Sequence, residues 1–141
     1  MKAKYEMAED IVVRLKKLIK RIEGTYKLLE SEEVTRGQLR VIVPIIKDGK
    51  GYSMAELAEM TSTDKGLVSR TIADLERNGI VQRDKSDNIG KNFKIILTPK
   101  GQAYFDDKIS KYRQAAPFWV NRVTAQEIET FKDILEKVTS D

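Results

Sequence analysis

Hydrophobic residues recur at helical spacing near both ends of the chain. Between Asp10 and Leu29 they follow the alternating four-and-three spacing of a heptad seam, and "TAQEIETFKDILEKV" repeats the pattern after a capping box of Thr124 and Glu127. Narrow seams favour helix-on-helix packing, so the pattern predicts two terminal helices that pair with those of a second copy of the chain. The alternative is that both helices pack on the rest of their own chain. The predicted seam residues are Ile11, Leu15, Leu18, Ile22 and Leu29 in the first helix and Ile128, Phe131, Leu135 and Val138 in the last.

Directly after the first terminal helix, the sequence predicts three shorter helices. Thr35 is placed to cap a helix that contains Pro44 and stops at "KDGKG", and Ser53 is placed to cap the short helix "MAELAEMT". After the break "TST", a further helix is expected from Asp64 to about Arg77. Two short helices joined by a tight turn, the second with a polar outer face, are typical of a helix-turn-helix.

A β-hairpin is predicted directly after this helix-turn-helix. Gly79 ends the preceding helix, because glycine adopts left-handed backbone without a Cβ penalty. The segments "IVQR" and "NFKIIL" have the length and β-branched content of strands, and the polar stretch between them forms a loop. Thr98 and Pro99 then start another helix, which Pro117 ends. The predicted inner face of that helix consists of Ala103, Phe105, Ile109, Tyr112 and Ala116.

Together these elements predict a mainly α fold with a small β-hairpin. We expect a winged helix-turn-helix domain over residues 35–100. The N-terminal helix of residues 1–34 and the C-terminal helices of residues 101–141 would then form a dimerisation domain. A chain of 141 residues can bury a core of this size, and no stretch approaches the roughly 20 apolar residues that span a bilayer. We therefore expect a cytoplasmic protein with no membrane partner.

The composition argues against catalysis and metal binding. The chain contains no cysteine and no histidine, which removes thiolate nucleophiles, imidazole acid-base catalysis and zinc sites built from Cys and His. The acidic residues Glu32, Glu33, Asp106 and Asp107 lack a converging base or nucleophile, so they are expected to be solvated charges. We therefore expect that the chain is not an enzyme and that it binds neither a metal ion nor a cofactor.

The excess positive charge lies in the middle of the chain. Residues 36–100 hold 12 Lys and Arg against 8 acids, whereas the two flanks together hold 14 of each. Basic side chains release counterions from DNA phosphates, so this distribution indicates double-stranded DNA as a partner.

The candidate DNA-binding residues lie on the second helix of the helix-turn-helix and on the hairpin. A helix that turns Val68, Ile72 and Leu75 inward presents its polar side to a major groove, where Arg70 can form a fork to guanine. The start of this helix is expected to offer free N–H groups to a phosphate. The hairpin is expected to add phosphate contacts as a wing. The candidates are Ser53, Lys65, Gly66, Ser69, Arg70, Arg83, Lys85, Lys91 and Lys94, with Lys100 as a further charge beside the hairpin. The alternative is an ordinary solvated face.

The order of motifs from "LAEMTSTDKGLVSRTIADLERNGIVQR" to "ILTPKG" resembles the MarR family of winged-helix transcriptional regulators. This resemblance implies a homodimeric repressor that binds pseudo-palindromic operators. It also implies release of DNA when a small aromatic or anionic ligand binds between the dimer helices and the winged domain. Family members commonly carry Asp-x-Arg in the wing, whereas Asp87 is followed here by "NIGK". The wing is therefore expected to add affinity more than sequence discrimination, with Lys91 or Lys94 as point charges.

Three residues are candidates for the ligand pocket that this resemblance implies. Lys17 and Arg21 lie four residues apart on the first helix, and Tyr112 would supply an aromatic wall from the helix after the wing. The alternative is a solvated basic stripe and a core tyrosine. A rival function for the whole chain is a winged-helix interaction module that binds an acidic protein without specific DNA binding.

Overall fold

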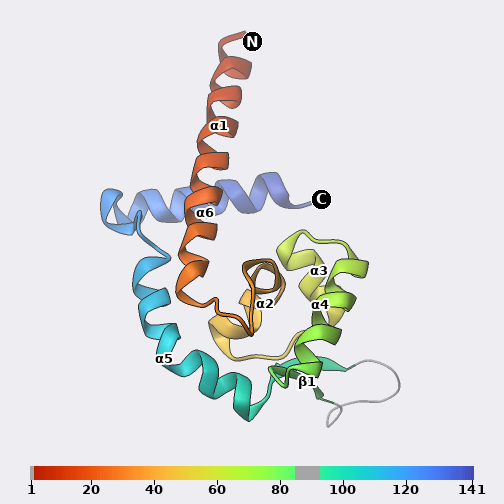
Figure 1. Ribbon diagram of the computed structural model, residues 1–141. Helices are drawn as coiled ribbons and strands as arrows, with labels where there is room; N and C mark the ends of the chain where they lie inside the picture. Colours follow the sequence, from red (N-terminus) through yellow and green to blue (C-terminus); the bar gives the residue numbers. More distant parts are fainter. Residues whose placement is uncertain (1, 85–92) are drawn as a thin grey trace.

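Most of the chain is helical, and two short strands form the single hairpin of the part that the structure describes. The computed structural model describes residues 2–84 and 93–141 (Figure 1). In chain order, the elements are α1 (Lys2–Gly24), η1 (Thr25–Leu28), α2 (Arg36–Asp48), α3 (Met54–Thr61), α4 (Lys65–Arg77), β1 (Val81–Asp84), β2 (Lys94–Leu97), α5 (Pro99–Ala115), η2 (Val120–Arg122) and α6 (Ala125–Thr139). The predicted fold class, mainly α with a small β-hairpin, is confirmed.

The helix starts follow from side-chain caps, four of which the sequence already indicated. Thr35, Ser53 and Thr124 each form a capping box, in which the hydroxyl accepts from the backbone N–H three residues on. Asp64 and Thr98 cap α4 and α5 in the same way through a single side-chain acceptor. These caps satisfy N–H groups that would otherwise have no partner in the first turn, which fixes where each helix begins.

The hydrophobic core lies in the middle block, between α2, α3, α4, the hairpin and α5. Val68, Ile72 and Leu75 of α4 are all fully buried, which confirms the predicted inner face of that helix. Pro44 lies inside α2 without ending it, so this helix lacks one backbone donor there. Ala103, which was predicted on the inner face of α5, is instead exposed, and the buried residues of α5 are Gly101, Phe105 and Tyr112.

The two strands of the hairpin are antiparallel, with Val81 opposite Leu97 and Asp84 opposite Lys94. A third segment, which the sequence pattern did not predict, joins them at Tyr52. The backbone N–H of Tyr52 donates to the carbonyl of Ile95 at 3.2 Å, and the N–H of Ile95 donates back at 2.7 Å. The linker between α2 and α3 therefore holds β2 against the helix-turn-helix.

A tight joint connects α4, β1 and α5. Gly79 has a φ of 73°, in the left-handed region that glycine favours, and the hydroxyl of Thr98 donates to its carbonyl. A Cβ at Gly101 would lie 2.1 Å from the carbonyl oxygen of Ile80, so only glycine allows the first turn of α5 to lie this close to the backbone just before β1. This joint fixes the direction of the hairpin relative to α4.

The first helix differs from its prediction at both ends. It begins at Lys2 instead of near Asp10, and it ends at Gly24 instead of continuing to Leu29. After η1, Leu29 and Val34 turn into the core of the middle block, where both are fully buried. Leu29 is therefore a core residue of its own chain and was wrongly assigned to the terminal seam, because the backbone leaves the helix five residues earlier.

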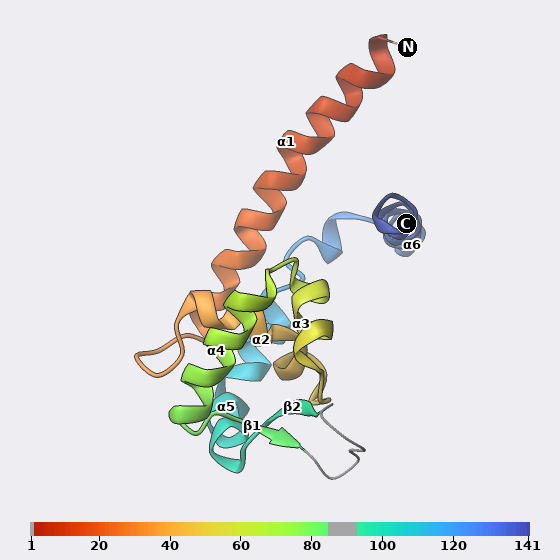
Figure 2. The ribbon, with the colours of Figure 1, turned by 90° about the vertical axis from the view of Figure 1, so that its right-hand side faces the viewer.

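The two terminal helices bury no residue within the chain. The N-terminal part of α1 projects away from the middle block, and α6 lies apart from α1 (Figure 2). Apolar side chains on both helices are exposed, including Ile11 at 55% and Val138 at 70%. No helix within residues 2–84 and 93–141 combines the length and apolar character needed to cross a membrane.

Candidate nucleic-acid interface

One face of α4 is exposed and polar, while the opposite face is buried. Lys65, Gly66, Ser69 and Arg70 are all exposed, as predicted. Helices α3 and α4 lie side by side, with the hairpin next to the C-terminal end of α4 (Figure 2). A polar helix face held on a rigid core, with a hairpin beside it, has the layout that enters a major groove.

Gly66 leaves room for the side chain of Arg70. A Cβ at Gly66 would lie 3.1 Å from Asp64 Oδ1 and 3.2 Å from Arg70 Nη1. The guanidinium of Arg70 therefore lies back over the first turn of α4, one helical turn from its own Cα. No ion pair within the described residues involves Arg70 or Lys65, so both charges are available to a ligand.

The start of α4 is less open to a phosphate than the sequence suggested. The carboxylate of Asp64 accepts the backbone N–H of Leu67 at 2.7 Å, so one of the donors expected to be free is already used. The same carboxylate places a negative charge at the helix start, where it competes with a phosphate for the helix dipole. Base contacts through Ser69 and Arg70 are accordingly better supported here than phosphate binding at the N-terminus.

Ser53 caps the start of α3, Lys94 begins β2, and both act on Glu56. The hydroxyl of Ser53 accepts the N–H of Glu56 at 3.1 Å, and the Ser53 side chain also forms a hydrogen bond with the Glu56 carboxylate. The pKa of Glu56 is lowered, first by its hydrogen bond with the backbone of Ser53 and further by the charge of Lys94. Lys94 is therefore an exposed cation beside the helix-turn-helix, as a DNA-contacting residue of the wing requires.

The remaining hairpin candidates separate into three groups. Arg83 is bound to Glu76 of α4 and stacks on Phe93, so its guanidinium is already engaged. Lys100 donates to the carbonyl of Asn78 at 2.8 Å, which caps the C-terminal end of α4. Lys85 and Lys91, together with the segment after Asp87 that lacks the family arginine, lie outside the described residues.

The residues predicted for a ligand pocket have different contacts in the structure. Tyr112 is buried next to Tyr26, with ring centroids 6.3 Å apart, and burial raises its pKa. The guanidinium of Arg21 lies 4.0 Å above the ring of Phe118. Lys17 is exposed on α1, one helical turn before Arg21. In the described ranges, no group of three or more acidic side chains is placed to hold a metal ion.

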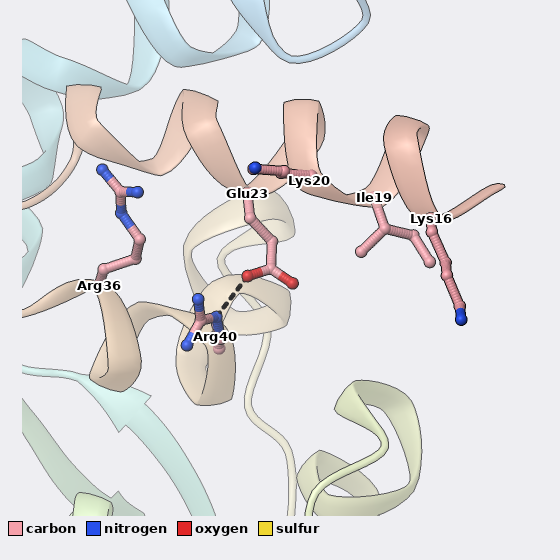
Figure 3. Close-up of a pocket in the computed structure, with 6 residues that line it drawn as sticks. All are labelled: Lys16, Ile19, Lys20, Glu23, Arg36 and Arg40. Carbon is pink, nitrogen blue, oxygen red and sulfur yellow. Dashed lines mark hydrogen bonds and ion pairs between the residues drawn. The ribbon is translucent and has the colours of Figure 1, made fainter. Parts of the chain in front are cut away.

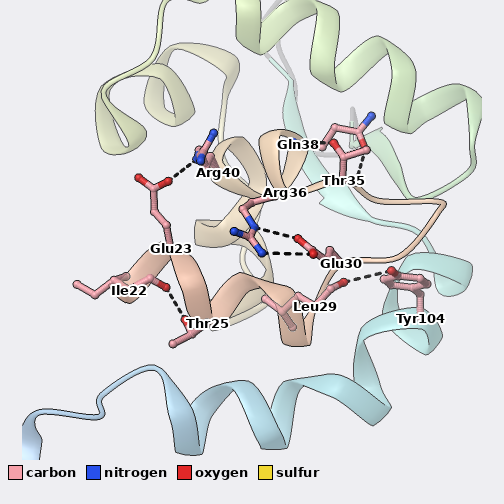
Figure 4. A network of polar contacts seen from close by, with 10 residues as sticks. All are labelled: Ile22, Glu23, Thr25, Leu29, Glu30, Thr35, Arg36, Gln38, Arg40 and Tyr104. Carbon is pink, nitrogen blue, oxygen red and sulfur yellow. Dashed lines mark hydrogen bonds and ion pairs between the residues drawn. The ribbon is translucent and has the colours of Figure 1, made fainter. Parts of the chain in front are cut away.

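A basic cavity that the sequence analysis missed lies between α1 and α2. Its volume is about 380 Å³, and its lining residues are Lys16, Ile19, Lys20, Glu23, Arg36 and Arg40 (Figure 3). Glu23 pairs with Arg40 at 2.6 Å, and Arg36 pairs with Glu30 at 3.0 Å (Figure 4). Neither Lys16 nor Lys20 has an ion-pair partner in the described part of the chain. The sequence feature that could have predicted this cavity is the spacing of its basic residues, which lie four positions apart in two successive helices.

A second cavity adjoins the first and reaches the helix-turn-helix. It has a volume of about 280 Å³ and shares Glu23 and Arg40 with the basic cavity. Its other lining residues are Tyr26, Val43, Pro44, Met60, Thr61 and Thr63; Thr61 ends α3, and Thr63 lies in the turn before α4. The Glu23–Arg40 pair thus separates a basic cavity from one with an aromatic and apolar wall.

Comparison with known proteins agrees with this architecture. The model of the MarR family matches residues 33–88. The HTH-type transcriptional repressor Rv2887 of Mycobacterium tuberculosis is 31% identical over 101 residues, which cover 72% of this chain and 73% of that protein.

Two solved structures share the fold at low sequence identity. The structure of NadR in complex with 4-hydroxyphenylacetate has a TM-score of 0.70 at 16% identity and covers 94% of this chain and 91% of its own. That of Bordetella bronchiseptica BpsR, whose DNA binding is regulated by 6-hydroxynicotinic acid, has a TM-score of 0.67 at 16% identity. It covers 93% of this chain and 99% of its own.

Proposed function

The chain belongs to the MarR family of transcriptional regulators, and on that premise we propose that it is a homodimeric repressor of pseudo-palindromic DNA sites. It is a regulator of transcription and not an enzyme. The observation that carries the proposal is the exposed face of α4, where Lys65, Ser69 and Arg70 point away from a helix whose other face is buried.

The uncovered terminal helices support the homodimer. Apolar side chains such as Ile11 and Val138 remain exposed in the single chain, and covering such surface stabilises an assembly by roughly 25 cal/mol per Å². A symmetric pair of chains would hold its two α4 helices at a fixed separation. Recognition helices fit successive major grooves when they lie about 34–36 Å apart, so the dimer sets which DNA sites can be bound.

Within the DNA-binding surface, we assign base contacts to α4 and phosphate contacts to the wing. Arg70 carries a planar fork that matches the two acceptors of guanine, whereas Lys94 and Lys91 are flexible point charges. Ser53, Lys65 and Ser69 would add contacts to the backbone or to base edges. Because the segment after Asp87 lacks the family arginine, the wing would contribute affinity more than discrimination.

A gel-shift titration of the region beside its own gene, in competition with bulk DNA, tests the proposal. Arg70→Ala should weaken binding to the preferred site by about 10- to 100-fold and relax its preference at one base position. Lys94→Ala should weaken binding to preferred and random duplexes equally, and should lower the salt slope by about one unit. Binding no tighter to any fragment than to bulk DNA would refute sequence-specific recognition and favour a protein-interaction module.

We further propose that a small aromatic acid weakens DNA binding by occupying the cavity between α1 and α2. The unpaired Lys16 and Lys20 would attract a carboxylate, and the adjoining wall of Tyr26, Val43 and Pro44 would accept a ring. Because this cavity joins a proposed dimer helix to the winged block, a ligand there would favour one separation of the two α4 helices over another.

A titration with 4-hydroxyphenylacetate, the ligand named for NadR, tests the cavity. Lys20→Ala should raise the ligand concentration that releases DNA by about tenfold, since it removes a charged hydrogen bond. Lys17→Ala is the matched control on the same helix outside this cavity, and it should leave that concentration unchanged. An effect of Lys17→Ala alone would instead support the pocket of Lys17, Arg21 and Tyr112.

A further inference from the structure

Arg83 connects α4 and the hairpin, to which the proposed function assigns separate contacts with DNA. Its guanidinium makes a two-pronged interaction with the carboxylate of Glu76, with Nε 3.1 Å from Oε2 and Nη2 3.2 Å from Oε1. Its Cζ also lies 4.5 Å from the centre of the Phe93 ring. Glu76 belongs to the last turn of α4, Arg83 to β1, and Phe93 immediately precedes β2.

This cluster lies where the hairpin meets the recognition helix. Arg83 is opposite Ile95 in the strand register, so Phe93, two residues before Ile95, is its diagonal neighbour at the start of the other side of the hairpin. One guanidinium therefore contacts α4 and both sides of the hairpin at once. Its planar fork fits the carboxylate, and its flat face fits the ring, a combination that lysine cannot reproduce.

We propose that Arg83 is a positioning residue that fixes the angle between the wing and α4, and that it does not itself contact DNA. This inference rests on the proposed DNA-binding function. The side chains of Arg83 and Glu76 are 38% and 29% exposed, so the pair is partly shielded and geometrically fixed. A phosphate contact would have to break this pair or form directly beside a carboxylate.

The direction in which Glu76→Ala changes DNA affinity distinguishes a positioning role of Arg83 from a direct contact with DNA. If Arg83 bound a phosphate, Glu76 would oppose that contact, and Glu76→Ala would tighten DNA binding. If the cluster positions the wing, Glu76→Ala leaves the hairpin less constrained and weakens binding, although it removes a negative charge. The two roles therefore predict opposite changes.

The experiment uses the full-length protein and a duplex selected by the wild-type protein from a random-sequence library, with an unselected duplex of equal length as reference. Glu76→Ala and Arg83→Ala should each weaken binding to the selected duplex by about three- to thirtyfold, the range expected for residues coupled in one contact. The double variant should lose no more than the more affected single variant. Arg83→Lys should behave like Arg83→Ala, because a phosphate contact tolerates lysine and the two-sided contact does not.

Asp74→Ala is the matched control. Asp74 lies on the same helix, and within residues 2–84 and 93–141 its ion-pair partner is Arg77 of the same helix, so its removal deletes one acid without affecting the contact of Arg83 with the hairpin. Binding should be unchanged or slightly tighter. Thermal unfolding of every variant checks that the fold persists, and the ratio of affinities for selected and unselected duplexes should fall only for Glu76 and Arg83 variants.

Four outcomes overturn the proposal. Tighter binding by Glu76→Ala, with a salt slope reduced by about one unit for Arg83→Ala, would make Arg83 a phosphate contact. Full retention of affinity by Arg83→Lys would do the same. A wild-type protein that selects no duplex would refute DNA recognition itself and the positioning role with it, whereas selection that survives all cluster variants would refute the positioning role alone.

Discussion

Helices α1 and α4 are both amphipathic, yet only α4 finds a partner for its apolar face within the chain. The 13 residues of α4 include four buried ones, whereas none of the 23 residues of α1 is buried. An apolar stripe in the sequence therefore indicates that one face of a helix will be covered, but it does not indicate which element or chain covers that face. In the middle block the partner comes from the same chain, and at the ends we propose that it comes from a second copy.

The largest effect, on the free energy of unfolding, is expected for a change in the core around α4. Ile72→Ala removes a fully buried side chain of α4 and should lower the free energy of unfolding by about 2–5 kcal/mol. Because the contacts that it removes lie within one chain, the loss should be the same at all protein concentrations in urea titrations. A loss that disappears at high protein concentration would mean that the middle block depends on a partner chain.

A change in the terminal helices is expected to weaken assembly of the dimer. Ile11→Asp places a charge in the proposed seam and should raise the dissociation constant of the dimer by roughly 100-fold, as expected when a charge is left unpaired in an interface. Val13→Asp is the matched control, since Val13 is 53% exposed and lies on the opposite side of α1. Sedimentation equilibrium measures both. Equal effects of the two variants would show that the seam is not the interface.

A smaller effect is expected at the joint between β1 and α5. Helix propensity alone predicts that Gly101→Ala stabilises α5, but the new Cβ would lie 2.1 Å from the carbonyl oxygen of Ile80. We expect a loss of about 1–3 kcal/mol in thermal or urea unfolding. Gly37→Ala in α2 is the control, because its Cβ would meet nothing closer than 4.0 Å and should stabilise the protein by up to about 1 kcal/mol.

The smallest effect is expected for Gly66→Ala in α4, which should change DNA affinity without lowering stability. Gly66→Ala should leave the unfolding free energy unchanged or slightly higher, since alanine favours the helix. It should nevertheless weaken specific DNA binding by about three- to tenfold, because the Cβ displaces the guanidinium of Arg70 from its place 3.2 Å away. Fluorescence anisotropy with a selected duplex measures the affinity. Unchanged affinity would mean that the position of Arg70 in the free protein is not the one used on DNA.

Much of the fold was predictable because its signals are local. The caps Thr35, Ser53, Asp64, Thr98 and Thr124 bond to backbone groups three residues away, so their roles follow from sequence spacing. The end of α1 was not predictable in this way. Leu29 continues the helical pattern of the seam, and only its burial in the middle block shows that the chain has already left the helix.

The candidate binding site shows the same division between local and distant contacts. The outward face of α4 followed from the period of its buried residues. The engagement of Arg83 with Glu76, and that of Lys100 with Asn78, join residues 7 and 22 positions apart, and no periodicity reports such pairs. The prediction groups Lys17 and Arg21 by their spacing of four on one helix and adds Tyr112 by residue type, whereas in the structure Arg21 lies over Phe118 and Tyr112 packs beside Tyr26.

The order of the helices, the inner face of α4, the glycine turn into the hairpin and the residue types available for recognition could all be predicted from the amino-acid sequence. These features depend on spacing along one segment, which periodicity and capping record directly. The three-dimensional packing is needed to know which cations face solvent and which are held by carboxylates or carbonyls, and where the cavities between α1, α2 and the helix-turn-helix lie. Such contacts join segments that are distant in sequence, and their geometry is set by the packing of the whole core.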